Sequence, residues 1–96
     1  MSLRDELTEL FYRHDPVGLA EIGAPADEYA PEVEGLLLRL NEATSQENLR
    51  RIVHSVFLQK FEAEETCGPE SAYEQISQEI WTRFLANPEV RRSWFI

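Results

Sequence analysis

Apolar residues recur at three- and four-residue intervals in four stretches of this 96-residue chain. That spacing places them on one face of an α-helix, whereas no stretch shows the strict alternation of a half-buried strand. The four sets are Leu3, Leu7, Leu10 and Phe11; Val33, Leu36, Leu37 and Leu40; Leu49, Ile52, Val53, Val56 and Phe57; and Tyr73, Ile76, Ile80, Trp81, Phe84 and Leu85. The sequence therefore predicts four amphipathic helices.

Capping and breaking residues mark where these helices begin and end. Ser2 is a suitable N-cap for the first helix, and Pro16 prevents its continuation. Pro31 fits the first position of the second helix, where its missing N–H costs nothing. For the third helix, Thr44 begins a capping-box pattern and Ser45 is the competing cap. These signals agree with the boundaries of the apolar pattern.

Short connections between the last three helices predict antiparallel neighbours in a bundle. The link from His14 to Ala30 is longer, and it carries enough apolar residues that we expect it to be ordered over one end of the bundle. Asn87-Pro88 ends the fourth helix and can begin a short C-terminal helical turn. We thus predict one all-α domain over residues 1–96, a four-helix bundle with a long ordered link between helices 1 and 2. The predicted buried residues are Leu10, Leu37, Val53, Phe57, Ile76 and Ile80.

The chain is strongly acidic, with a net charge of −9 from 18 acidic and 9 basic residues. Such a charge repels nucleic acid and anionic membranes and favours a basic partner, although it also simply maintains solubility. The acids are concentrated in two stretches without Lys or Arg, residues 15–38 and 61–82. If the two stretches lie on adjacent surfaces, they form one negative field that accelerates association with a basic protein.

The sequence predicts a cytoplasmic protein without a cofactor. It has a single cysteine, no apolar leader and no run near the roughly 18 apolar residues of a membrane span. His14 and His54 have no His or Cys at zinc-ligand spacing, and the acids do not match a calcium loop. Cys67 lies in an acidic neighbourhood that disfavours a nucleophile. We therefore predict no metal site, no catalytic residue and no enzymatic activity.

The long link contains the most distinctive residues of the chain. Asp15, Pro16, Gly18 and Leu19 form a D-P-x-G-L element, and Gly23, Pro25, Asp27, Glu28 and Tyr29 form a G-x-P-x-D-E-Y element. With these elements the chain resembles a family of small, uncharacterised bacterial all-helical proteins, a domain of unknown function. Some relatives look like immunity proteins of toxin systems, so the resemblance implies a protein that binds another protein.

The link residues permit both a structural and a binding interpretation. Asp15 before Pro16 can form an Asx turn, Asp27 can cap a helical turn, and Tyr29 can bury its ring. We expect Asp27 and Tyr29 to hold the link in place. The alternative is that Asp15, Asp27 and Glu28 form an acidic site for a cation or a basic side chain.

The predicted function is a non-catalytic protein-binding module with an acidic surface, immunity-like in character. Tyr29 and Tyr73, if exposed, would supply the aromatic anchors that dominate binding energy. The predicted partner-binding residues are Asp27, Glu28, Tyr29, Glu32, Glu70, Tyr73 and Glu74. The alternative is a self-associating structural bundle, for which Trp94, Phe95 and Ile96 could form a homodimer contact.

Overall fold

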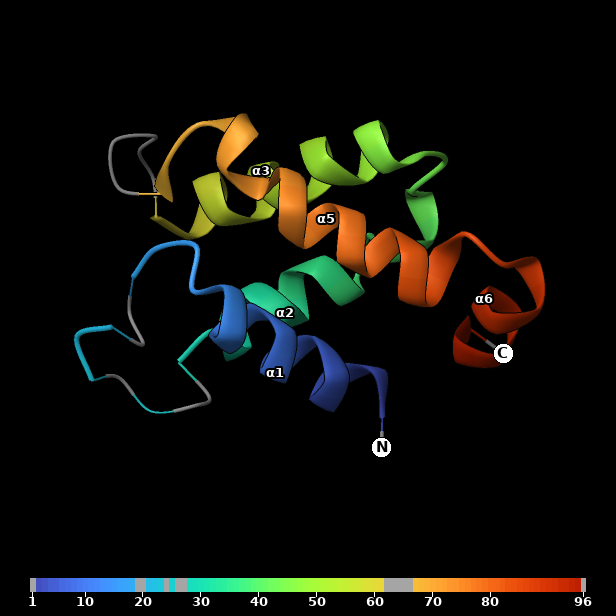
Figure 1. Ribbon diagram of the computed structural model, residues 1–96, viewed down its shortest axis with the longest axis horizontal. Coiled ribbons are helices and arrows are strands. Elements are labelled where there is room, and N and C mark those ends of the chain that lie inside the picture. Colours follow the sequence, from blue (N-terminus) through green and yellow to red (C-terminus); the bar gives the residue numbers. More distant parts are fainter. Residues whose placement is uncertain (1, 19–20, 24, 26–27, 62–66, 96) are drawn as a thin grey trace.

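The computed structural model is an all-α protein (Figure 1). It describes residues 2–18, 21–23, 25, 28–61 and 67–95, with the side chains of residues 94 and 95 outside that description. No strand occurs in these ranges. The all-α class predicted from the helical periodicity is therefore confirmed.

Helix α1 spans Leu3–His14, so it begins directly after the predicted cap, Ser2, and ends before Pro16. Ser2 Oγ accepts a hydrogen bond from the amide of Asp5 at 3.1 Å, which satisfies one of the free donors of the first turn. Asp15 ends the helix in the left-handed conformation, at φ 49°, and its amide still donates to the carbonyl of Phe11. Pro16 then turns the chain into the link.

Helix α2 (Ala30–Leu37) contacts helix α3 (Gln46–Phe61), and a 3₁₀ turn, η1 (Leu40–Glu42), lies between them. Gly35 makes this approach possible, because a Cβ at that position would lie 3.0 Å from Cγ1 of Val56. Ser45, the competing cap, is the residue that caps α3: its Oγ accepts from the amide of Asn48 at 3.0 Å. The Thr44 capping box is thus wrong by one residue.

The fourth predicted helix is built from three consecutive helical types. A 3₁₀ turn, η2 (Glu70–Tyr73), leads into α5 (Glu74–Ile80), which continues as the π-helical segment η3 (Trp81–Leu85). The wider turn of the last segment is completed by the amide of Ala86, which donates to the carbonyl of Trp81 at 2.8 Å. Such segments occur preferentially near functional sites.

Helix α6 (Pro88–Phe95) is longer than the predicted C-terminal turn and packs against η3. Asn87 accepts from the amide of Glu89 at 2.9 Å and so caps its start. Arg91 reaches back to the carbonyl of Asn41 at 2.9 Å, which fixes the helix to η1. The homodimer contact predicted for residues 94–96 falls on side chains outside the described part of the chain.

One hydrophobic core lies between α1, α2, α3 and α5. Phe57 is at its centre, with ring centroids 5.4 Å from Phe11, 5.9 Å from Tyr29 and 5.0 Å from Tyr73. All of the predicted core residues are buried except Leu37, which is only partly buried against the core. Leu37 is the last residue of a short helix, where the chain turns towards η1.

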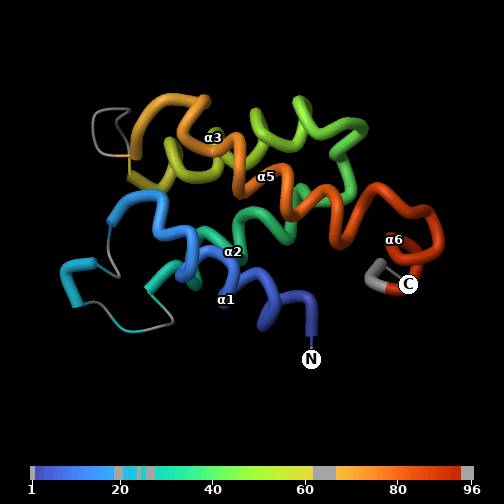
Figure 2. Tube along the Cα trace, viewed as in Figure 1, coloured from blue at the N-terminus to red at the C-terminus, as the bar shows by residue number. Residues whose placement is uncertain are grey.

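Two connections that are distant in the sequence lie at the same end of the molecule (Figure 2). The described residues of the link, the end of α3 and residues 67–69 gather there, whereas α6 lies at the opposite end (Figure 1). We name the former the link end. It brings together the beginnings of the first acidic stretch, at Asp15, and of the second, at Phe61.

Candidate functional site

The long link is fastened to the core by a small set of hydrogen bonds, which we name the clasp. The hydroxyl of Tyr29 donates to Oδ1 of Asp15 at 2.8 Å and accepts from the amide of Val17 at 3.2 Å. Oδ2 of Asp15 accepts from the amide of Glu21 at 3.1 Å. The clasp therefore joins Asp15 of the first sequence element to Tyr29 of the second.

Tyr29 anchors the clasp because its ring is fully buried. The ring packs edge-on against Phe11, with centroids 6.4 Å apart, while its hydroxyl is hydrogen-bonded to Asp15 at the start of the link. The prediction that Tyr29 holds the link is confirmed, and Asp27, its predicted companion, lies outside the described residues. The carboxylate of Asp15 bonds to the amide six residues on, not to one two residues on as in a simple Asx turn.

The clasp presents a turn over residues 21–23, all of which are exposed. Gly23 has a φ of 91° and Gly18 a φ of 81°, conformations that favour glycine. Between them Ile22 is 80% exposed. Glu21 and Glu28 are exposed as well, and neither forms an ion pair with a described residue.

The two predicted aromatic anchors are wrong. Tyr29 and Tyr73 are both fully buried, because their rings complete the cluster around Phe57. The hydroxyl of Tyr73 donates to the carbonyl of Cys67, and its pKa is raised, first by burial and then by the neighbouring side chain of Cys67. Neither ring can reach a partner, so Ile22 is the apolar side chain that this end of the molecule offers.

Most of the remaining predicted acids have neighbours that reduce their availability. Arg50 of α3 pairs with Glu70 at 3.0 Å and with Glu74, which also accepts from Gln46 at 3.3 Å. Glu32 is only 5% exposed. The base-free stretch in the sequence is thus compensated in space by arginines from other helices, and Glu28 alone remains exposed and unpaired among the described predicted residues.

Glu32 has a second unusual property: its Oε2 is buried and has no hydrogen-bond partner in the described part of the chain. Burial raises the pKa of this carboxyl, and the negative charge of Glu28 raises it further. A hydrogen bond to its own backbone and the positive charge of Lys60 act in the opposite direction. Position in the first turn of α2, where acids are favoured, gives no hint of this burial in the sequence.

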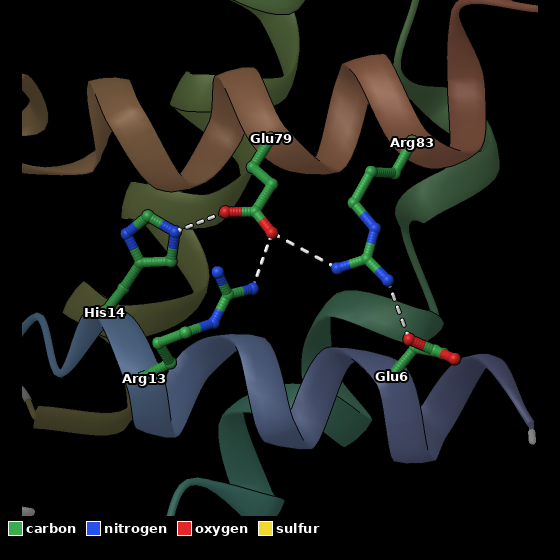
Figure 3. A network of polar contacts seen from close by, with 5 residues as sticks. All are labelled: Glu6, Arg13, His14, Glu79 and Arg83. Atoms are coloured by element: carbon green, nitrogen blue, oxygen red, sulfur yellow. Dashed lines mark hydrogen bonds and ion pairs between the residues drawn. The ribbon is translucent and has the colours of Figure 1, made fainter.

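A second polar cluster joins α1 to α5 (Figure 3). Oε2 of Glu79 accepts from Arg13 at 2.5 Å and from Arg83 at 3.1 Å, while its Oε1 lies 2.8 Å from Nε2 of His14. Arg83 also pairs with Glu6 at 2.8 Å. Partial burial of Glu79 raises its pKa, but the three hydrogen bonds outweigh it and lower the pKa to about 2.

The bond to a carboxylate fixes the tautomer of His14. Because Glu79 is ionised and accepts, Nε2 of the imidazole carries a proton and Nδ1 is an acceptor when the ring is neutral. Nδ1 faces away from Glu79 (Figure 3) and has no hydrogen bond to a described residue. Two adjoining pockets, of about 280 and 370 Å³, are both lined by this ring.

Nothing in the described ranges gathers three or more His, Cys, Asp or Glu side chains into a metal-binding group. Cys67 is buried, and His54 bonds to the carbonyl of Gly68 at 3.1 Å. Ser71 shares a pocket with His14, but no hydrogen bond joins them. Among the helices described, none is long and apolar enough to cross a membrane.

The cluster around Glu79 was not predicted from the sequence. Its members come from both ends of the chain, and each is an ordinary surface residue in its own helix. The spacing of Glu79 and Arg83 predicts a local pair at i, i+4, but not the contribution of α1. A scan of protein-family models finds no match to the chain, and searches of curated proteins and of solved structures find no significant similarity.

Proposed function

We propose that this protein is a non-catalytic protein-binding module that engages a basic partner through the turn held by the clasp. The observation that carries the proposal is that the Ile22 side chain is 80% exposed. It lies between Glu21 and Tyr29, which are both hydrogen-bonded to Asp15. Glu21, the preceding residue, and Glu28, near the end of the link, are both exposed and supply negative charge. The action is immunity-like: the module covers a surface of its partner.

An exposed isoleucine and unpaired carboxylates on the same link are typical of a protein interface. The isoleucine can serve as an apolar anchor, and the carboxylates can attract a basic partner. Ile22 would enter an apolar pocket of the partner and lose its contact with water. Glu21 and Glu28 would raise the association rate with a positive surface, and salt would screen this effect over about 8 Å at physiological ionic strength. The clasp reduces the entropy lost on binding, because the amide of Glu21 is already held by Asp15. We place this activity in the cytoplasm, where a lone thiol stays reduced.

Self-association is the second candidate, and Leu38 favours it. This side chain, at the end of α2, is 82% exposed. The other exposed large apolar residues of the described chain lie on different elements, and Leu58 and Val90 are only 36% exposed. A single exposed apolar residue is usual on a monomer. We prefer the turn at Ile22 because hydrogen bonds to Asp15 hold its neighbour Glu21 and the end of the link at Tyr29.

Affinity capture from the source organism, followed by mass spectrometry and reconstitution with the purified partner, tests the proposal. Ile22→Ser should abolish capture of a basic protein, while Leu38→Ser, which removes an equally exposed side chain elsewhere, should not. Reversal of Glu21 and Glu28 to lysine should slow association and flatten its dependence on salt. A partner that binds Ile22→Ser as tightly as the wild type would refute the proposal. A dimer in light scattering that Leu38→Ser dissociates would favour self-association.

A further inference from the structure

The carboxyl of Glu32 is buried at the link end and lacks a partner for one of its oxygens. The residue is 5% exposed, and its Oε2 has no hydrogen bond to a described residue. It belongs to the first turn of α2, directly after Tyr29 of the clasp, Ala30 and Pro31. An ionised carboxylate in this place has lost its water without gaining donors, which is the costly state for a buried charge.

The titratable groups that face Glu32 come from the link, α3 and η2. Glu28 of the link repels a negative charge on the carboxyl, whereas Lys60 of α3 attracts it without a hydrogen bond to Oε2. Burial raises the pKa of Tyr73 in η2 most, and Glu32 is among the groups that raise it further. The ring of His54 packs against that of Tyr73, with centroids 5.6 Å apart. The charges of Glu28 and Lys60 act against each other, and neither replaces the hydrogen bond that Oε2 lacks.

The two buried phenol groups of the link end already donate to other acceptors. Tyr29 donates to Oδ1 of Asp15, and Tyr73 donates to the carbonyl of Cys67. A phenol has a single hydroxyl proton, so neither ring can also donate to Glu32 in this arrangement. In the packed state, the remaining way to remove the unpaired charge is a proton on the carboxyl itself.

The first turn of α2 connects Glu32 to the clasp. The carbonyl of Tyr29 accepts from the amide of Val33 at 3.0 Å, so Glu32 lies within a hydrogen-bonded turn that begins at Tyr29. The hydroxyl of the same tyrosine holds Asp15 and accepts from the amide of Val17. A displacement of this turn is therefore transmitted directly to the clasp.

We propose that the link end is a proton-dependent switch that sets how firmly the clasp holds the exposed turn. With a proton on Glu32, the first turn of α2 stays packed and the clasp is closed. When the proton leaves, the carboxylate moves towards water, displaces Tyr29 and opens the clasp more often. Each opening releases one proton, so a lower pH favours the ordered turn. This inference adds a control to the turn of the proposed function, and it rests on that function only for the effect on a partner.

Amide hydrogen exchange of the free protein between about pH 5 and 8, followed by NMR, tests the switch. The exchange rates of Val17 and Val33, divided by their intrinsic rates, should rise by up to about tenfold per pH unit and then level off, as one linked proton requires. The amide of Arg91, which bonds to Asn87 at the opposite end, should show no such rise. The ¹³C signal of the Glu32 carboxyl should titrate above pH 4.5, its ordinary pKa, over the same range.

Two carboxamide variants separate Glu32 from its neighbours. Glu32→Gln cannot ionise, so the corrected exchange rates of Val17 and Val33 should no longer depend on pH. Glu28→Gln, at an exposed neighbouring position, is the matched control and should keep the rise. A rise that persists in Glu32→Gln would assign the effect to another group, such as His54, and overturn the switch. A flat wild-type profile, or a Glu32 carboxyl that titrates at or below pH 4.5, would overturn it as well.

The same measurements distinguish failure of the switch from failure of the proposed function. Ile22→Ser leaves Glu32 and the clasp in place, so it should retain the pH-dependent exchange even where it abolishes capture of a partner. If Ile22→Ser still captures the partner while the exchange depends on pH, the proposed function fails and the switch stands. If the exchange is independent of pH and Ile22→Ser abolishes capture, the turn binds its partner without this control and the switch fails.

Discussion

The carboxylates of Glu79 and Glu32 are both largely removed from water, but their surroundings shift their pKa values in opposite directions. Glu79, between α1 and α5, accepts hydrogen bonds from His14, Arg13 and Arg83, and its pKa falls to about 2. Glu32, at the link end, leaves Oε2 without a partner in the described chain, and its pKa rises. Burial raises both pKa values, and only the hydrogen-bond donors around Glu79 reverse the direction of the shift.

The contrast gives the two groups opposite effects on the pH dependence of stability. The pKa of Glu79 is lower in the folded than in the unfolded chain, so its contribution is present above the unfolded value of about 4.5 and is lost as the pH falls towards 2. The pKa of Glu32 is higher in the folded chain. Its protonated form is favoured by folding, so stability declines as the pH rises from below 4.5 through the folded pKa.

The largest effect is expected from a cavity in the core of the link end, where Glu32 is buried. Phe57→Ala should lower the free energy of unfolding by about 3–5 kcal/mol, because it removes the ring that Phe11, Tyr29 and Tyr73 contact. Urea denaturation measures the loss. If the remaining fold admits water to the link end, the pKa of Glu32 should also return towards its usual range. A loss below roughly 1 kcal/mol would contradict the central position of Phe57.

Removing the charge of Glu79 tests whether its lowered pKa stabilises the fold. Glu79→Gln should cost about 2 kcal/mol at pH 7, the usual value for hydrogen bonds to a charged group, since its side chain is only 25% exposed. The difference from the wild type should shrink below pH 4.5 and vanish near pH 2. Glu89→Gln, at an exposed position, is the control. An equal loss at every pH would show that shape rather than charge is responsible.

The hydrogen bonds of the clasp should stabilise the link end. Tyr29→Phe keeps the buried ring and removes the bonds to Asp15 and Val17, so it should cost about 1–1.5 kcal/mol. The loss should depend little on salt concentration, unlike the loss of an exposed ion pair, which salt screens. Proteolysis of the link should accelerate more than global unfolding does. Unchanged cleavage would mean that the hydroxyl does not fasten the link.

The smallest effect, and the only gain, is expected at Glu32. Glu32→Gln should raise stability by about 1 kcal/mol at pH 7, because a neutral amide avoids the cost of a buried charge. The gain should disappear at low pH, where the wild-type carboxyl is protonated, and thermal melts across pH 3–8 would detect it. Glu28→Gln, at an exposed neighbouring position, should produce a smaller change. A loss of stability at pH 7 would indicate that the charge of Glu32 is needed.

The fold was largely predictable because periodicity reports burial directly. The apolar sets predicted the helices, and Ser2 and Pro16 marked the limits of α1 correctly. Helix α2 begins one residue before Pro31, at Ala30. The 3₁₀ and π segments around α5 were not predicted, since they depend on how the chain adjusts its turns to packing. Sequence signals also could not separate Thr44 from Ser45 as a cap, because both have the required hydroxyl.

The candidate site was less predictable, because acids can be neutralised by bases that are far away in the sequence. Glu70 and Glu74 belong to a base-free stretch, yet Arg50 of another helix neutralises them. Tyr29 and Tyr73 read equally well as anchors and as core residues until their surroundings are known. The link elements did single out Asp15 and Tyr29 as structural residues, but not the hydrogen bond between them. The binding role of the turn that they hold remains a prediction.

The clasp has a consequence for how a protein of this kind can diversify. Its hydrogen bonds fix both ends of the link, so the chain between them can change in length or composition without disturbing the helices. Doubling the length of a flexible loop costs only about 0.6 kcal/mol. A single helical scaffold could therefore carry many different recognition turns, and new specificities could be grafted between Gly18 and Glu28 while the same core is retained.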